Sequence, residues 1–357
     1  MKKNNKILYL EILRILAAFF VIFNHTGING FFLFSKYGVN TITFWLGAFF
    51  SIFCKFSVPM FFGISGILLL NKEESIKDIW KNRILKVFIT LILISTLFYC
   101  YDVFYAKTET FNLITYIKKL YTNGNNIVLW YLYGYMAFLI CLPFLRSIVK
   151  HLEDKHYYYL IIIAILFNGI IPIIEWLFFK GTITLYYKMY PTWIINELFI
   201  YPLIGYFMHY KYKFKNVKKE LSLLWISNII LIFLCCFMIY YKGEIDGDIL
   251  EANSQAFHYS FVIVNFITIF LTIKHFFNNK EIKPLLSKII YSLGECTFGI
   301  YLIHVLVKNF TFKIYTFIDS ILRIKLLTSF LWVFVIMMAS YIIVYILKKI
   351  PILKKYI

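Results

Sequence analysis

The chain is poor in charged residues for its length. Charged side chains make up 15% of its 357 residues, whereas an average soluble domain holds about 25%. Hydrophobic residues account for 61% and aromatic residues for 21%. This composition excludes a water-soluble domain with a polar surface. It predicts an all-α, polytopic membrane protein, organised as a single membrane-embedded domain over residues 6–349.

Acidic residues are the scarcest charged class. The chain has 18 Asp and Glu against 37 Lys and Arg, which gives a formal net charge of +19. The basic residues stand in short clusters between apolar runs, an arrangement typical of loops that face an anionic cytoplasmic leaflet. We therefore expect the lipid bilayer, and not nucleic acid, to be the partner of this positive charge.

Several motifs of cofactor chemistry are missing. The sequence has no glycine-rich phosphate loop, no His-Glu-x-x-His pair and no cysteine spacing of a haem or iron–sulfur site. ATP-driven and metal-centred reactions are therefore not indicated, and we expect no metal site and no tightly bound cofactor. All six cysteines fall in apolar runs, which favours small core residues over disulfides or metal ligands.

Ten apolar runs approach or exceed the length of about 20 residues that a membrane-spanning helix needs. They cover residues 8–27, 44–70, 84–106, 127–148, 157–179, 192–210, 221–241, 257–277, 289–309 and 327–347. Every second loop is basic, from the N-terminus onward, whereas the loop after the seventh run is acidic. These charges include Lys2, Lys3 and Lys6 before the first run, and Glu244, Asp246, Asp248 and Glu251 in the acidic loop. The positive-inside rule then predicts about ten transmembrane helices with both termini in the cytoplasm.

The first run carries three ionisable residues, Glu11, Arg14 and His25, in an otherwise apolar segment. A charge inside a membrane span is costly, so such residues usually face protein or water and serve a function. Arg14 and His25 are separated by close to three helical turns, so they share one helix face, about 16 Å apart along the axis. Glu11 stands one turn before Arg14, within reach of an ion pair.

Two later runs also hold polar residues with more than one interpretation. In the second run, Gly63 and Gly66 allow another helix to approach closely. Ser65 between them either bonds back to its own helix carbonyls or belongs to a site. In the ninth run, His304 needs a partner, because a buried polar group without one costs about 1–3 kcal/mol. It is either a member of a structural network or a second histidine of the site.

Other candidates lie near predicted helix ends. Trp130 and Tyr131 open the fourth run, either as part of an aromatic belt or as a platform for a sugar-like acceptor. Glu197, near the outer end of the sixth run, is either interfacial or functional. The short amphipathic segment 74–83 is expected to lie along the inner membrane surface.

Five segments, in chain order, resemble the acyltransferase-3 family of integral membrane acyltransferases, which modify surface polysaccharides and other envelope glycans. The family's main mark is an arginine, ten residues and a histidine in the first helix, matched by Arg14 and His25, with Glu11 as the acidic residue before them. Further matches are residues 61–66, 81–86, 129–132 with 142–146, and 300–304. Val87 stands where a proline often follows the basic stretch. As no hydrolase-like segment follows, the chain resembles the stand-alone form.

The resemblance implies transfer of an acyl group, most often acetyl, from cytoplasmic acyl-CoA to a hydroxyl of an outward-facing or lipid-linked glycan. It implies the bacterial cytoplasmic membrane as the location, His25 as the catalytic residue, and Arg14 as essential through the donor. Histidine suits a general base near neutral pH, and arginine suits phosphate. The further candidates are Glu11 beside Arg14; Lys81, Arg83, Lys86 and Ser65 on the donor side; and Trp130, Tyr131, His304 and Glu197 on the acceptor side.

One alternative function comes from another class. A transporter or exporter of a glycan or lipid-linked precursor would also be basic, polytopic and aromatic. Such a protein is expected to show inverted repeats or a pair of broken helices, and the sequence shows neither. The residues leave open which acceptor is used, which acyl chain is moved, and whether His25 is a general base or carries the acyl group covalently.

Overall fold

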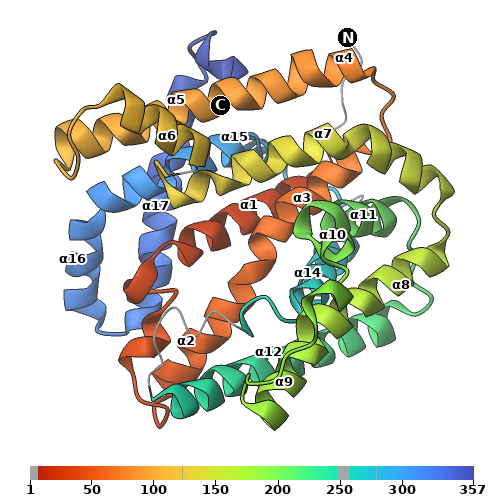
Figure 1. Ribbon diagram of the computed structural model, residues 1–357. Helices are drawn as coiled ribbons and strands as arrows, with labels where there is room; N and C mark the ends of the chain where they lie inside the picture. The colour runs from red at the N-terminus through yellow and green to blue at the C-terminus, as the bar shows by residue number, and fades with distance from the viewer. Residues whose placement is uncertain (1–6, 123, 248–256, 279) are drawn as a thin grey trace.

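The computed structural model describes residues 7–122, 124–247, 257–278 and 280–357, and every regular element in these ranges is a helix (Figure 1). The expected all-α fold is therefore confirmed. The first half holds α1 (Leu8–Asn24), α2 (Ile42–Phe53), α3 (Ser57–Leu69), α4 (Ile76–Ile79), α5 (Leu85–Cys100), α6 (Leu113–Thr122), α7 (Trp130–His151), α8 (Asp154–Ile165) and α9 (Ile171–Phe179). The second half holds α10 (Thr192–Ile195), α11 (Glu197–Tyr210), α12 (Val217–Asp246), α14 (Val262–Phe277), α15 (Pro284–Phe310), α16 (Phe312–Leu322) and α17 (Lys325–Leu347).

Some of these helices join into longer rods. A 3-10 turn at Cys54–Phe56 links α2 to α3, and a π-helical turn at Trp80–Ile84 links α4 to α5. Most of the amphipathic segment 74–83 therefore forms the start of a helix, Ile76–Tyr105, while Glu74 and Ser75 precede it. Its expected position along the inner membrane surface stays a prediction.

Seven helices in the described residues are long and apolar enough to cross a membrane. They are Ile42–Leu69, Ile76–Tyr105, Trp130–His151, Asp154–Phe179, Val217–Asp246, Pro284–Phe310 and Lys325–Leu347. α1, α11 and α14 are shorter, with 17, 14 and 16 residues. The chain is thus a multi-pass membrane protein, while the count of ten spans and the side of each terminus stay predictions.

α1 runs through the interior of the bundle, in contact with α3, α14, α15 and α17 (Figure 1). Most of its apolar side chains are buried, as Tyr9, Leu13 and Phe23 illustrate, and none of them is exposed. By contrast, α12 leaves Ile226 and Ile230 exposed, as expected of side chains that face lipid. The polar residues of α1 therefore lie inside the bundle, where Glu11 is buried and Arg14 is partly exposed.

Glycines set the distance between α3 and α11. A Cβ atom on Gly66 would stand 2.1 Å from the carbonyl oxygen of Pro202, and one on Gly205 would stand 2.4 Å from that of Gly63. Any larger side chain at these positions would push the two helices apart. The predicted close approach at Gly63 and Gly66 is confirmed, with α11 as the partner helix.

The acidic loop predicted after the seventh run differs in part from the structure, and the N-terminal basic cluster is not tested by it. Glu244 and Asp246, expected in an acidic loop, belong to the last turns of α12. Lys2, Lys3, Lys6, Asp248 and Glu251 lie outside the described residues. The charge alternation that supports the topology therefore stays a prediction at both of these places.

Candidate functional site

Glu11 and Arg14 form an ion pair one turn apart on α1. Nη1 of Arg14 donates to Oε1 of Glu11 at 2.5 Å, which confirms the pair expected from their spacing. Gly294 of α15 makes room for the carboxylate, because a Cβ atom there would stand 2.2 Å from Oε2 of Glu11. Glu11 is buried whereas Arg14 is partly exposed, so the carboxylate holds the guanidinium from the protein side.

A cavity of about 520 Å³ lies beside Arg14, a size suited to a small-molecule ligand. Its lining includes four cationic side chains and one carboxylate: Arg14, Lys72, Arg83, Lys86 and Glu295. The cations come from α1, from the loop after α3 and from the helix that leads into α5. Because positive charge predominates in the lining, the cavity favours an anionic ligand.

The helix leading into α5 turns one face toward the cavity. This face carries Asn82, Arg83, Lys86 and Val87. Lys81, which we expected among the donor residues, does not line the cavity. Lys81 is exposed in the π-helical turn Trp80–Ile84, and its place among the donor residues stays a prediction.

Ser65 of α3 combines its two proposed interpretations. Its hydroxyl donates to the carbonyl of Phe61 at 2.8 Å, as expected of a serine that bonds back to its own helix. The same residue also lines the cavity, together with Phe61. Backbone bonding and a place in the cavity wall are therefore compatible here.

Aromatic rings form much of the remaining wall. Tyr131 stacks on Tyr135, with ring centres 5.7 Å apart, and meets Tyr301 edge-on at 5.1 Å. All three tyrosines line the cavity. Trp130 contacts the ring of Tyr131 at 6.5 Å but is not part of the lining. Tyr131, which we expected beside the acceptor, thus shares a cavity with Arg14 and Arg83.

His25 and His304 are hydrogen-bonded to each other although they lie 279 positions apart in the sequence. Nδ1 of His25 and Nε2 of His304 are 2.9 Å apart. His25 follows the last residue of α1, and His304 is fully buried in α15. His304 thus has the partner that its burial requires, and the bond to His25 is compatible with both of its interpretations.

The hydrogen bonds fix the direction of the protons in this pair. Nδ1 of His304 lies 2.6 Å from the carbonyl oxygen of Tyr301, and a carbonyl only accepts, so this nitrogen carries a proton. In a neutral imidazole the other nitrogen is then an acceptor. Nε2 of His304 therefore accepts from Nδ1–H of His25. With both rings neutral, Nε2 of His25 keeps a free lone pair, which is the state a general base needs.

Tyr301 connects the cavity with the histidine pair. Its ring lines the cavity, and its carbonyl accepts from His304. Its hydroxyl donates to the carbonyl of Val128, just before α7. One residue thus forms a cavity wall and orients the partner of His25.

Two further lysines make contacts in the interior of the protein. Lys308 lies beside His25, and Lys55 lies in the turn between α2 and α3. Nζ of Lys308 donates to the carbonyl of His25 at 3.0 Å. Lys55, in the turn between α2 and α3, is buried with its ammonium 4.5 Å from the ring centre of Phe31 and 3.4 Å from the hydroxyl of Tyr259. Sequence reasoning assigned neither lysine to a site.

Other residues were missed or lie elsewhere. Glu197 begins α11, is partly buried and does not line the cavity. Lys72, Tyr135 and Tyr301 line it without having been predicted. Tyr301 stands inside the segment 300–304 that resembles the family, and this was the one available signal for it.

Comparison with known proteins gives one match. The family model described as an acyltransferase domain matches residues 7–349 of the chain. No curated protein and no solved structure matches the chain.

Proposed function

Since the chain belongs to the acyltransferase-3 family, a family of membrane acyltransferases, we propose that it moves an acetyl group from acetyl-CoA to a hydroxyl of an extracytoplasmic or lipid-linked glycan. The setting we propose is the cytoplasmic membrane of a bacterium. The observation that carries the proposal is a cationic cavity connected through Tyr301 to the pair of His25 and His304.

The proposed binding of acetyl-CoA, the acyl donor, rests on the charge and shape of the cavity. Acetyl-CoA carries several phosphate charges at one end and a long, nearly neutral arm that ends in the thioester. Arg14 and Arg83 offer guanidinium groups, which bind phosphate through two parallel hydrogen bonds. Tyr131 and Tyr135 offer flat, largely apolar walls for the arm. The arm would then lead from the cations toward Tyr301.

The chemical step rests on the lone pair of His25. The acceptor hydroxyl gives its proton to Nε2 of His25 while its oxygen attacks the thioester carbonyl. The carbon–sulfur bond then breaks, and the imidazolium returns the proton to the departing sulfur. The products are an ester and free CoA, and His25 ends neutral. His304 keeps the Nδ1–H of His25 in place throughout, so the reactive nitrogen stays unprotonated between turnovers.

The test is transfer of labelled acetyl from acetyl-CoA into the envelope glycans of membranes that contain the protein. Wild type should incorporate label that mild base releases as acetate, because the product is an ester. His25→Ala should lower incorporation about 10²–10⁴-fold, the usual contribution of a general base. Donors with succinyl in place of acetyl would establish which acyl group is used.

A matched control separates the site from general effects of losing a histidine. His151 is exposed at the end of α7, so His151→Ala should incorporate label at the wild-type rate. All three proteins are compared at equal membrane abundance. Equal incorporation by His25→Ala and wild type would refute the role of His25. No incorporation by wild type, with intact donor, would refute the acyl transfer from acetyl-CoA proposed here.

A further inference from the structure

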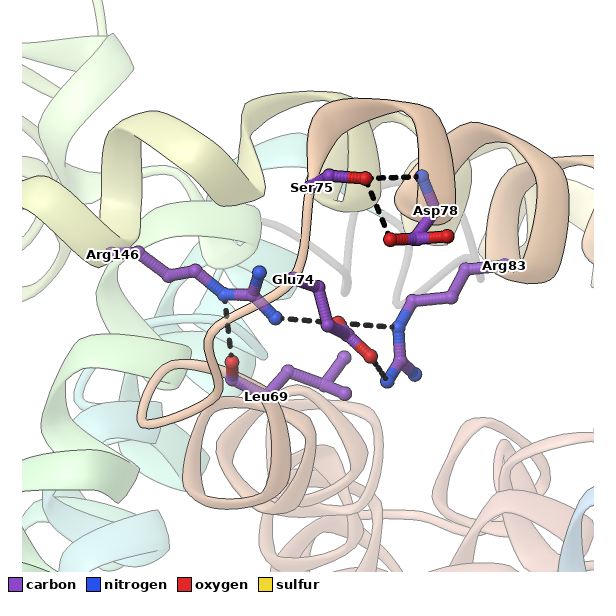
Figure 2. Close-up of polar contacts among 6 residues, drawn as sticks. All are labelled: Leu69, Glu74, Ser75, Asp78, Arg83 and Arg146. Atoms are coloured by element: carbon purple, nitrogen blue, oxygen red, sulfur yellow. Dashed lines mark hydrogen bonds and ion pairs between the residues drawn. The ribbon is translucent and has the colours of Figure 1, made fainter.

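A carboxylate holds together two arginines at the rim of the cavity (Figure 2). Glu74 accepts from Nε and Nη2 of Arg83 at 3.0 and 2.6 Å, and from Nη2 of Arg146 at 2.7 Å. We call Glu74, Arg83 and Arg146 the Glu74 clamp. Arg83 lines the cavity whereas Arg146, buried on α7, does not. The clamp therefore ties one cavity cation to the interior of the bundle.

The clamp also fixes the loop that carries a second cavity cation. Nε of Arg146 donates to the carbonyl of Leu69 at 3.0 Å, at the end of α3, while its Nη2 binds Glu74 at the other end of the loop. One guanidinium thus joins both ends of the segment 70–74. Lys72 stands in the middle of this segment and lines the cavity.

The helix start beyond the clamp is fixed as well. The hydroxyl of Ser75 accepts from the backbone N–H of Asp78 at 3.1 Å and donates to its carboxylate at 2.6 Å (Figure 2). This N-cap sets where the helix that carries Arg83 begins. Loop and helix are therefore both held in place before any ligand arrives.

The clamp leaves Arg83 able to bind an anion. Its two bonds to Glu74 use two of the five N–H donors of a guanidinium, so the Nη1 end remains for a ligand. Two guanidinium groups and one carboxylate also leave one positive charge in excess. The two arginines hold the pKa of Glu74 at about 2, well below its ordinary value, so the carboxylate stays charged at physiological pH.

From this arrangement we infer that Glu74 and Arg146 are positioning residues, which set Lys72 and Arg83 at the cavity rim to receive the phosphates of the donor. The inference rests on the proposed function, since it assigns the cavity to acyl-CoA. Neither Glu74 nor Arg146 contacts the donor in this account. Their role is to orient Lys72 and Arg83 before binding, which lowers the entropy lost on binding.

Charge-conserving variants test orientation without changing the field of the cavity. Glu74→Asp keeps the charge but shortens the reach to the two arginines. Arg146→Lys keeps the charge but cannot donate to Leu69 and Glu74 along two fixed directions. Glu73→Asp is the matched control, because Glu73 is the neighbouring residue and is exposed, and its nearest cation, the exposed Lys150, lies 3.9 Å away.

The measurements are the Kd of coenzyme A by calorimetry, and kcat and KM with acetyl-CoA, on the full-length protein in detergent. We expect Glu74→Asp and Arg146→Lys each to raise Kd and KM about tenfold, with kcat unchanged and the thermal midpoint lowered by no more than a few degrees. Glu73→Asp should match wild type in every value.

Other results overturn the inference, the proposed function or both. A Kd within twofold of wild type in both clamp variants would mean that the clamp does not orient the cations. Parallel losses of kcat, affinity and thermal midpoint would mean that it only supports the fold. A wild type that binds coenzyme A but transfers nothing would refute the proposed function alone, since Kd still tests the clamp. A wild type that binds no coenzyme A would refute both.

Discussion

The two ends of α1 offer opposite environments. At the Arg14 end, a cavity of about 520 Å³ is lined by cations that reach solvent in part. At the His25 end, two imidazoles and a backbone carbonyl form a directed chain of hydrogen bonds with the buried segment 299–304 of α15. The Arg14 end thus offers a charged cavity, whereas the His25 end offers side chains in a fixed orientation. The difference suggests that donor binding and chemistry are separated along one helix, so mutations at each end should affect KM and kcat differently.

Besides the loss of His25 itself, the largest expected effect comes from filling the cavity. Ser65→Trp places an indole at a wall residue, so it should lower transfer roughly 100-fold by excluding the donor. The histidine pair should be untouched. Ser147→Trp, at an exposed position of α7, is the control. Normal rates in Ser65→Trp would show that the donor does not occupy this cavity.

Next in size is the loss of the partner of His25. His304→Phe keeps an aromatic ring but removes the acceptor for Nδ1–H of His25. Losing one such hydrogen bond costs about 1–3 kcal/mol, so kcat should fall about 10- to 100-fold. Calorimetry should show an unchanged Kd for coenzyme A, and His304→Gln should recover part of kcat. If His304→Phe instead lost affinity for coenzyme A and kept its kcat, the His25 end would serve donor binding and not chemistry.

A smaller effect is expected from the glycine beside Glu11. Gly294→Ala would place a methyl 2.2 Å from Oε2 of Glu11, so the carboxylate must move and the hold on Arg14 must change. We expect KM for the donor to rise roughly three- to tenfold with little change in kcat. Gly38→Ala is the control, because a Cβ atom there meets nothing within 4 Å. An unchanged KM would indicate that the Glu11 pair does not orient Arg14.

The smallest effect concerns acid stability at the cavity end. The pKa of Glu74 is about 2 in the folded protein, below an ordinary value of about 4.3. Its stabilisation is therefore complete above the ordinary pKa and is lost as the pH falls toward 2. Between pH 5 and pH 3, the thermal midpoint should fall a few degrees more in wild type than in Glu74→Gln. Equal shifts in the two proteins would contradict this contribution.

Local spacing in the sequence predicted the features that depend on one helix. The ion pair of Glu11 and Arg14 follows from a separation of one turn, and the glycines of α3 follow from their small size. Lys81 is not among the residues that line the cavity, whereas Arg83 and Lys86 are, and its assignment to the donor stays a prediction.

Contacts between distant segments were beyond the reach of the sequence. The bond between His25 and His304 joins positions far apart in the chain, and periodicity within one helix carries no information about which helices pack together. The bond from Arg146 to Glu74 is another such contact. The position of Tyr131 beside Arg14 and Arg83 in one cavity depends on how α7 packs, which the spacing within one helix does not specify.

The most direct test of the separation along α1 is calorimetric binding of coenzyme A to two purified variants. Arg14→Gln should raise Kd at least about tenfold, because it removes a charged phosphate ligand from the cavity. His25→Ala should bind coenzyme A with a Kd within twofold of wild type although its transfer is abolished. The account would be contradicted if His25→Ala lost binding while Arg14→Gln kept it.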